Sequence, residues 1–417
     1  MASEMKTLLE SAKQASYVLA AASTEIKNKA LRTMAEELEK QEKKILDANK
    51  MDLDQLRQKE GFNEAFYDRL LLNSQRIEAM AEGIEDIAAL PDPVGEIESM
   101  SPRPNGLLVG RMRTPLGVVG IIYEARPNVT VDAAGLSLKS GNAVVLRGSS
   151  EALNSNIALA EVLREALVSC GLPDGSVVLI READRAAARE MMRMNQYLDV
   201  LIPRGGPALI KAVIENATVP VIQTGAGNCH TYIDEGADVG MAVSIAINAK
   251  IHRPGVCNAL ETLLVNERIA DRVLPPIIEA LIAEHVEIRG CELARKYHEK
   301  VKLADEEDWF TEYLSLVMAV RVVSSMQEAI DHIHKYGTGH SECIVTDDYQ
   351  RSRKFLRLVD AAAVYVNAST RFTDGFEFGL GGEMGISTQK LHARGPMGLD
   401  ALTGLKYVIL GDGQTRS

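Results

Sequence analysis

The sequence is poor in cysteine, and the few cysteines form no motif. The 417 residues include five cysteines and no CxxC pair. The five are Cys170, Cys229, Cys257, Cys291 and Cys343. An odd and widely spread set argues against a disulfide framework and against a zinc site. The pattern is typical of a reduced intracellular protein.

Other absences exclude further classes of protein. The amino terminus carries acids and lysines early and has no apolar core of signal-peptide length, and no apolar run is long enough to span a bilayer. The formal net charge of −12 speaks against a general nucleic-acid binder, which needs a basic face. We therefore expect a cytoplasmic protein that binds neither membrane nor nucleic acid. An anionic small substrate remains compatible with this charge if its site is locally basic.

What is present indicates an α/β protein. The chain has 46% apolar and 25% charged residues, as soluble proteins do, and is long enough for two or three domains. Apolar residues recur at helical spacing from residue 5 to about 89. From residue 116 to 225, apolar strands alternate with helices, which indicates a parallel sheet that binds ligands at the carboxyl ends of its strands. A second α/β region follows residue 257.

Some segments do not fit this alternation simply. Residues 91–104 contain prolines and break the pattern, and residues 219–222 are predicted to close the first series as a strand. Two further predicted strands, at 106–113 and 405–410, have no obvious neighbour in sequence. Since an isolated strand needs a partner, these two require an explanation.

The segment of residues 250–265 joins a predicted helix to a predicted buried strand. Pro254 and Gly255 force a sharp change of direction, and Cys257 follows this turn. His252 and Arg253 precede it, and nearby cations favour the reactive thiolate form of cysteine. From the stretch alone two interpretations of Cys257 stay open. It is either a nucleophile or a small buried hydrophobic residue, as most free cysteines are.

Two glycine-rich segments are further candidates. The dinucleotide fingerprint GxGxxG is absent, but Arg204-Gly205-Gly206 at a predicted helix start suits a phosphate, although a Gly-Gly pair is more often simply a tight turn. Residues 367–385 form a long glycine-rich run, either a mobile linker or a functional loop. We favour function, because Arg371, Phe372 and Phe378 are not typical of a linker.

Four stretches of the chain carry a specific resemblance. They are YEARPNVTVD at 123–132, LIPRGG at 201–206, VYVNASTRFTDG at 364–375 and STQKLHARGPMGL at 387–399. Together they closely resemble the gamma-glutamyl phosphate reductase family, also called glutamate-5-semialdehyde dehydrogenases, within the aldehyde dehydrogenase superfamily. The resemblance extends over nearly the whole chain.

The resemblance implies an aldehyde dehydrogenase-like α/β fold of two doubly wound parallel-sheet domains and a small β arm for oligomerisation. Residues 1–100 and 116–229 would bind the cofactor, residues 230–399 would form the catalytic domain, and residues 101–115 and 400–417 would form the arm. The two strands without neighbours would then pair across subunits of a homo-oligomer.

The resemblance also implies a reaction. The family reduces L-glutamyl 5-phosphate to L-glutamate 5-semialdehyde and phosphate with NADPH, the second step of proline synthesis from glutamate. A Cys257 thiolate would form a thioester with release of phosphate, and hydride from NADPH would reduce it. The Asn128 side-chain amide and the Cys257 backbone N–H would form the oxyanion hole. Without the resemblance, Asn128 is better explained as a turn residue after Pro127.

One departure from the superfamily is informative. Hydrolytic aldehyde dehydrogenases have a glutamate in a Glu-Leu-Gly-Gly motif that activates water, and the matching segment here reads QTGAG at 223–227. Glutamine at Gln223 cannot act as a carboxylate base. The departure suits an enzyme whose thioester is resolved by hydride or phosphate and not by water.

The remaining site residues are carried over from the resemblance or from their charge. Glu312 would hold the nicotinamide ribose, and Arg147 a 2′-phosphate, which favours NADPH. Gly205 and Gly206 would line the pyrophosphate. The candidate partners of the substrate's phosphate and carboxylate are Arg126, His252, Arg253 and Arg371. A surface acid (for Glu312) and structural ion pairs (for the arginines) are the alternatives.

Two other functions remain in competition. A CoA-acylating aldehyde dehydrogenase also uses a thioester and lacks the water-activating glutamate. A non-catalytic scaffold for glutamate 5-kinase is a second alternative, which the intact Cys257, Asn128 and Glu312 argue against. An association of an active enzyme with that kinase would make chemical sense, because glutamyl phosphate is labile, but no sequence feature indicates it.

Overall fold

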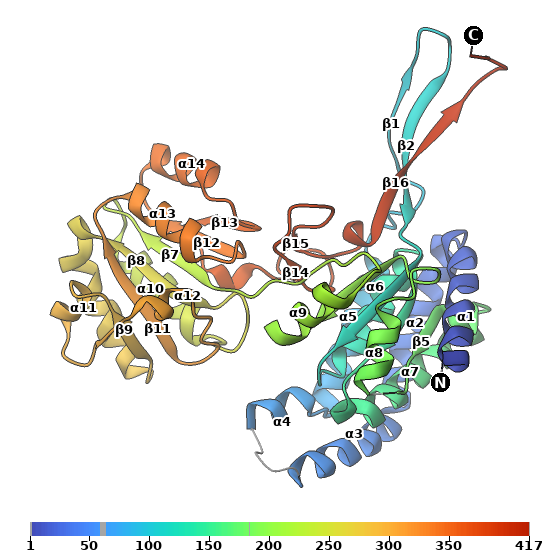
Figure 1. Cartoon of the computed structure of the whole chain (residues 1–417), viewed down its shortest axis with the longest axis horizontal. Helices are drawn as coiled ribbons and strands as arrows, with labels where there is room; N and C mark the ends of the chain where they lie inside the picture. The colour runs from blue at the N-terminus through green and yellow to red at the C-terminus, as the bar shows by residue number, and fades with distance from the viewer. Residues whose placement is uncertain (1, 59–63, 183, 417) are drawn as a thin grey trace. The chain divides into compact units, whose positions relative to one another are not determined.

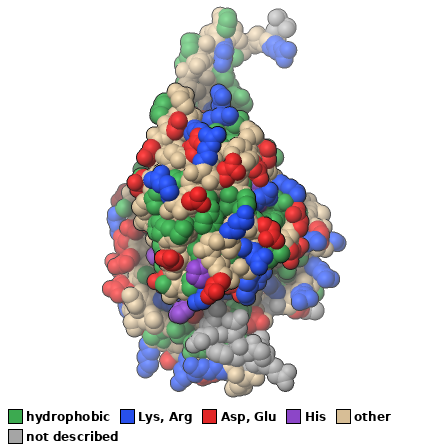
Figure 2. All heavy atoms as spheres, turned by 90° about the vertical axis from the view of Figure 1, so that its left-hand side faces the viewer, with side chains coloured by type: hydrophobic (Ala, Val, Ile, Leu, Met, Phe, Trp, Pro, Cys, Tyr) green, Lys and Arg blue, Asp and Glu red, His purple; other side chains and the backbone are tan. Residues whose placement is uncertain are grey.

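The computed structural model describes residues 2–58, 64–182 and 184–416. The chain divides into two compact units. Unit 1 comprises Met1–Gln223, Gly379–Gly385 and Met397–Ser417, and unit 2 comprises Thr224–Phe378 and Ile386–Pro396. Within the described ranges no helix is both long and apolar enough to cross a membrane. On the face drawn in Figure 2, acidic and basic side chains are interspersed with hydrophobic ones.

Unit 1 begins with the expected helices (Figure 1). Their bounds are α1 Ala2–Ala20, α2 Thr24–Lys40, α3 Glu42–Arg57, α4 Glu64–Leu70 and α5 Ser74–Ala89. Ser23 and Asn73 cap α2 and α5, since their side chains accept hydrogen bonds from the backbone N–H groups of Ile26 and Arg76. The apolar stripes of α2 and α5 are buried, and the two helices pack against each other. The apolar periodicity in the sequence therefore reflects a packed layer of helices.

A four-stranded parallel sheet forms the centre of unit 1, in the order β5-β4-β3-β6. The strands are β3 Val118–Tyr123, β4 Ala143–Arg147, β5 Val177–Leu179 and β6 Val200–Arg204. The helices between and after them are α6 Asn128–Lys139, α7 Leu153–Ser169, α8 Arg185–Met191 and α9 Pro207–Asn216, with the short helices η1 Ser150–Ala152 and η2 Asp174–Ser176. Every residue of β3 is buried, as the continuous apolar run predicts.

The predicted strand at 219–222 is wrong as a regular strand. Only an isolated bridge joins Val221 to Leu201 there. Pro220 offers its carbonyl to the N–H of Leu201 but has no N–H of its own, so a regular ladder cannot continue through it.

The two strands without sequence neighbours find their partner in the same chain. We expected β2 Leu108–Pro115 and β16 Thr403–Leu410 to pair across subunits, but they pair with each other as antiparallel strands. A third strand, β1 Ile97–Pro102, completes a sheet of order β1-β2-β16, which extends away from the rest of unit 1 (Figure 1). The proline-rich break hid β1, because this edge strand is exposed along almost its whole length and shows no apolar alternation.

Unit 2 contains a seven-stranded parallel sheet of order β10-β9-β11-β8-β7-β12-β13. The strands are β7 Cys229–Ile233, β8 Leu260–Asn266, β9 Glu287–Gly290, β10 Lys302–Leu303, β11 Val317–Val323, β12 Ser341–Val345 and β13 Ala363–Val366. The helices are α10 Val239–Ile251, α11 Glu267–Ala283, α12 Glu306–Phe310, α13 Met326–Tyr336 and α14 Tyr349–Leu358, with the short helices η3 Ala294–Tyr297 and η4 Thr370–Phe372. Two short antiparallel strands, β14 Ile386–Ser387 and β15 Gly395–Pro396, follow, and η5 Asp400–Leu402 precedes β16 in unit 1.

Helices cover both faces of this sheet. Leu263 and Val265 of β8 pack in one apolar cluster with α10 and α11, while Leu264 packs in another with α13 and α14. Adjacent residues of one strand therefore belong to opposite clusters, which is the pattern of a doubly wound sheet. The predicted α/β class with two parallel sheets is confirmed.

Candidate active site

Cys257 lies in the turn between α10 and β8, as predicted. Asp238 caps α10, since its carboxylate accepts the N–H of Met241 at 2.8 Å, and β8 begins at Leu260. The Cys257 side chain is partly exposed, whereas Cys229 and Cys343 are fully buried. Cys257 therefore differs from the buried cysteines and has the access that a nucleophile needs.

A buried ion pair joins the two elements on either side of this turn. The Lys250 Nζ in the last turn of α10 lies 2.6 Å from the Glu261 Oε2 in β8, and both side chains are fully buried. The other oxygen of Glu261 accepts the N–H of Leu314 at 3.1 Å. Burial raises the pKa of Glu261 to about 7 and lowers the pKa of Lys250. The pair fixes the ends of the turn, and the sequence analysis did not identify it.

Gly227 packs directly against the nucleophile's backbone. A Cβ atom added there would lie 2.7 Å from the Cα of Cys257 and closer still to its carbonyl group. The N–H of Gly227 donates a 2.6 Å hydrogen bond to the carboxylate of Glu312, whose pKa is raised by burial. Glu312 is thus a half-buried group and not a surface acid, and it shares a neighbour with Cys257.

Cys229, the neighbour of His230, supports the backbone of Cys257. Its thiol is fully buried and donates a 3.1 Å hydrogen bond to the carbonyl oxygen of Cys257. Burial raises the pKa of Cys229 well above the ordinary value, which disfavours its reactive thiolate. These contacts give Cys229 a structural role.

Asn258, which the sequence analysis missed, ties the glycine-rich segment to this turn. The side-chain amide of Asn258 donates to the carbonyl oxygens of Arg371 at 3.2 Å and of Thr373 at 2.9 Å. The hydroxyl of Thr370 donates to the Asn258 carbonyl oxygen at 2.7 Å. The first part of the run at 367–385 is therefore docked on the residue after Cys257 and is not a free linker.

The cations predicted to surround Cys257 differ in their exposure. His252 and Arg253 are exposed, and Arg371 is half-buried. Burial lowers the pKa of Arg371, and the charge of Arg253 lowers it further, while Asp374 and the Cys257 thiol act in the opposite direction. The Nε of Arg371 is buried without a hydrogen-bond partner in the structure.

The oxyanion candidate Asn128 belongs to unit 1. It is the first residue of α6, its side chain is exposed, and its amide donates a 3.0 Å hydrogen bond to Asp132. Burial raises the pKa of Asp132 to about 6, although this bond and Arg204 favour the ionised form. Because a carboxylate only accepts, the bond fixes which end of the Asn128 amide faces Asp132. Arg126, just before this helix, is half-buried.

The cofactor candidates of unit 1 lie at the carboxyl ends of β4 and β6, the two strands that flank β3 in the sheet. Arg147 ends β4 and donates a 2.8 Å hydrogen bond to the Asp184 carbonyl oxygen, and burial lowers its pKa. Gly205 and Gly206 follow β6, at the start of α9. The N–H of Gly206 donates at 2.9 Å to the carboxylate of Glu124, so it can serve a pyrophosphate only if this side chain rotates away.

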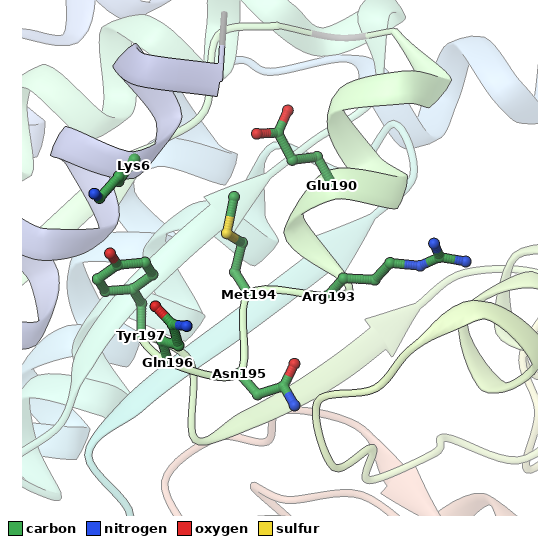
Figure 3. Close-up of a pocket in the computed structure, with 7 residues that line it drawn as sticks. All are labelled: Lys6, Glu190, Arg193, Met194, Asn195, Gln196 and Tyr197. Carbon is green, nitrogen blue, oxygen red and sulfur yellow. The ribbon is translucent and has the colours of Figure 1, made fainter.

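A prominent cavity lies elsewhere. It measures about 620 Å³, and its side chains come from α1, from the end of α8 and from the loop between α8 and β6 (Figure 3). Its lining consists of Lys6, Glu190, Arg193, Met194, Asn195, Gln196 and Tyr197. It contains none of the predicted site residues and precedes the amino end of β6, whereas parallel sheets bind ligands at the carboxyl ends. This cavity does not identify the reaction site.

Comparisons with known proteins identify the class to which this fold and site belong. The model of the aldehyde dehydrogenase family matches residues 1–288. The chain belongs to that family. The acetylating aldehyde dehydrogenase of Geobacillus thermoglucosidasius, with a TM-score of 0.72, 20% identity and coverage of 100% of this chain and 98% of that one, shares the fold.

Within the family, the full-length relatives at high sequence identity include gamma-glutamyl phosphate reductases. The gamma-glutamyl phosphate reductase of Moorella thermoacetica is 59% identical over 416 residues, which cover 100% of this chain and 99% of that protein. That of Carboxydothermus hydrogenoformans is 60% identical over 413 residues, with 99% of each covered. The crystal structure of the Thermotoga maritima gamma-glutamyl phosphate reductase has 51% identity and a TM-score of 0.96, covering 99% of this chain and 100% of that one. The family resemblance predicted from the four stretches is confirmed, and the chain is an oxidoreductase.

Proposed function

We propose that this enzyme reduces L-glutamyl 5-phosphate to L-glutamate 5-semialdehyde and phosphate with NADPH, in proline biosynthesis. Full-length identity near 60% to proteins named for this reaction supports the proposal. The observation that carries it is the partly exposed Cys257 in a turn held between Gly227 and Asn258, beside Arg371. A positioned thiol with adjacent cations suits attack on an anionic acyl phosphate.

The proposed chemistry runs through a thioester on this cysteine. The Cys257 thiolate attacks the acyl carbon, the C–S bond forms and phosphate leaves. The Asn128 amide and the Cys257 backbone N–H stabilise the oxyanion, as in the superfamily. NADPH, when bound, supplies the hydride that releases the aldehyde and returns the thiolate.

Residues of both units suit the cofactor. One carboxylate oxygen of Glu312 accepts the N–H of Gly227. The second oxygen would be the acceptor for a ribose hydroxyl. Arg147 offers a cation at the end of a parallel strand for the 2′-phosphate of NADPH. Gly205 and Gly206 remain the candidates for the pyrophosphate, subject to movement of Glu124. Substrate anions are assigned to Arg126, His252, Arg253 and Arg371. The proposed domain roles stay those of the prediction: cofactor binding for residues 1–100 and 116–229, catalysis for residues 230–399, and oligomerisation for residues 101–115 and 400–417.

The segment that replaces the water-activating motif supports a thioester protected from hydrolysis. A Cβ at Gly225 would lie 2.7 Å from the Thr388 hydroxyl oxygen, and Gly227 abuts Cys257, so this backbone is tightly packed. No residue of 223–227 carries a carboxylate. The thioester can then await hydride or phosphate.

We also propose that the enzyme is a homo-oligomer. Among the described residues β16 pairs on one side only, and its Leu405, Tyr407 and Ile409 side chains are 39%, 70% and 53% exposed. An apolar edge strand of this kind invites pairing with another copy of the chain. A cytoplasmic location and an association with glutamate 5-kinase stay predictions.

The test runs the reaction backwards, which avoids the labile acyl phosphate. We expect reduction of NADP⁺ by glutamate 5-semialdehyde to require phosphate, to vanish in Cys257→Ala, and to persist in the matched control Cys170→Ala. Turnover that ignores phosphate but requires CoA would favour the acylating dehydrogenase. A folded wild-type protein without turnover would favour the kinase scaffold.

A further inference from the structure

Arg253 and Arg371 are two cations near Cys257 that interact electrostatically with each other. Neither arginine forms an ion pair among the residues that the structure describes, although arginines elsewhere in the unit pair with carboxylates, as Arg289 does with Asp308. The charge of Arg253 acts on Arg371, and so does the thiol of Cys257, so the three groups share one electrostatic environment.

Such an arrangement is costly without a ligand. Two like charges repel, and half-burial removes part of the water that would screen them. Asp374 offsets only part of this charge, and the buried Nε of Arg371 has no hydrogen-bond partner in the described structure. A bound dianion would satisfy both the charge and the unused donor, because a guanidinium binds phosphate through paired hydrogen bonds.

Asn258 fixes the place of this cation. Its buried side chain holds the carbonyl oxygens of Arg371 and Thr373, and its own carbonyl accepts the Thr370 hydroxyl. The backbone that carries the Arg371 guanidinium is thus fastened to the residue that follows the nucleophile. The backbone of Arg371 is therefore preorganised with respect to Cys257, which lowers the cost of ordering this segment when a ligand binds.

We propose that Arg253 and Arg371 form the subsite for the departing phosphate of the acyl phosphate, with Asn258 as the positioning residue that holds Arg371 at Cys257. This inference rests on the proposed function and decides between the substrate's two anions. In an acyl phosphate, a single bridging oxygen separates phosphorus from the attacked carbon. The α-carboxylate lies at the far end of the carbon chain. Arg371, which interacts electrostatically with the thiol and with Arg253, is therefore placed nearer to the phosphate than to the α-carboxylate.

Thiolate attack on the acyl phosphate needs no further reagent. The thiolate electron pair forms the C–S bond, and the bond between the acyl carbon and the bridging oxygen breaks. That oxygen takes the bonding pair and leaves with the phosphate, which acquires a proton from solvent. The two guanidinium groups stabilise the charge that grows on the departing phosphate.

The reverse reaction separates the two anions, because phosphate and semialdehyde are then independent substrates. We expect Arg371→Ala and Arg253→Ala to raise the KM for phosphate at least about tenfold, through loss of charge-assisted hydrogen bonds, with the KM for semialdehyde within about twofold of wild type. Arg371→Lys keeps the charge but not the paired donors, so its KM for phosphate should lie between those of the wild type and Arg371→Ala. Arg272→Ala, an exposed arginine of α11, is the matched control and should change neither constant.

A binding readout tests the positioning role of Asn258 independently of turnover. Inorganic phosphate should slow alkylation of Cys257 by iodoacetamide, followed on the Cys257 peptide by mass spectrometry. Asn258→Ala should raise the half-protecting phosphate concentration several-fold, and it should add nothing in the Arg371→Ala background. A purely structural Asn258 would lower the melting temperature and leave the half-protecting concentration unchanged.

The outcomes distinguish the two levels of proposal. If the wild type shows phosphate-dependent turnover but the arginine variants raise the KM for semialdehyde alone, these arginines hold the carboxylate and the phosphate subsite is refuted. If the wild type shows no phosphate-dependent turnover, the proposed function fails and the subsite fails with it. A selective rise in the phosphate KM supports both.

Discussion

Replacing Gly227 by alanine should inactivate the enzyme without unfolding it. The added Cβ would lie 2.7 Å from the Cys257 Cα and closer still to its carbonyl group. Carbon atoms in contact prefer about 3.5–4.0 Å, so the two backbones must separate by at least about 1 Å. A misplacement of about 1 Å costs on the order of 10²-fold in rate. The same movement strains the hydrogen bond from Gly227 to Glu312.

The assay is phosphate-dependent reduction of NADP⁺, combined with the alkylation rate of Cys257. We expect Gly227→Ala to lower kcat/KM at least about 10²-fold and to change the alkylation rate. Gly255→Ala is the matched control, because a Cβ there would find no atom closer than the Leu314 carbonyl oxygen at 3.7 Å. A folded Gly227→Ala enzyme with wild-type turnover would refute the claim that this close packing sets the position of the nucleophile.

Three further predictions concern stability and assembly. Lys250→Met leaves Glu261 as an unpaired buried carboxylate and should cost about 3–5 kcal/mol in urea unfolding, and adding Glu261→Leu should recover much of that loss. Burial lowers the pKa of His332 to about 2 from its ordinary 6.5. Below pH 6.5 the His332 imidazole is therefore protonated in the unfolded chain but stays neutral in the folded chain. Stability should therefore fall by up to about 1.4 kcal/mol per pH unit as the pH drops below 6.5, and unfolding of His332→Gln should show a shallower dependence. Tyr407→Lys should shift the oligomer towards smaller species in analytical ultracentrifugation, because it places a charge on the exposed edge strand, and an unchanged mass would exclude β16 from the interface.

The elements that could be predicted from the sequence are those whose buried positions hold apolar residues. The strands β3 and β4 are almost continuous apolar runs within the region where alternating apolar strands were predicted. β8 lies in the predicted buried strand that ends at residue 265, although Glu261 and Thr262 interrupt its apolar residues. β7 was missed, because its buried face includes His230, which is satisfied by a 3.0 Å contact with the buried Glu342 across the sheet. A polar residue that is paired far away in sequence looks like a loop residue in a local pattern.

The site residues also divide into those with a local sequence signal and those without one. Cys257 became a candidate through a proline-glycine turn and adjacent cations, which are all local, and the family resemblance then favoured the nucleophile over the buried hydrophobic residue. Gly227 and Asn258 were not predicted, because their roles depend on segments about 30 and 113 residues away from their partners. A tight backbone contact or a docked loop leaves no periodicity in the sequence, so only the folded chain reveals it.

Gly227 has a consequence for how cofactor and substrate influence each other. One side of this residue contacts the Cys257 carbonyl group, and its N–H holds the carboxylate proposed to bind the nicotinamide ribose. A ligand that draws Glu312 towards itself therefore acts on the backbone that supports the thiol. Thermodynamic linkage makes this influence mutual. Whatever factor cofactor binding applies to the equilibrium acylation of Cys257, acylation must apply to cofactor affinity, so the two equilibria would be coupled through a single glycine.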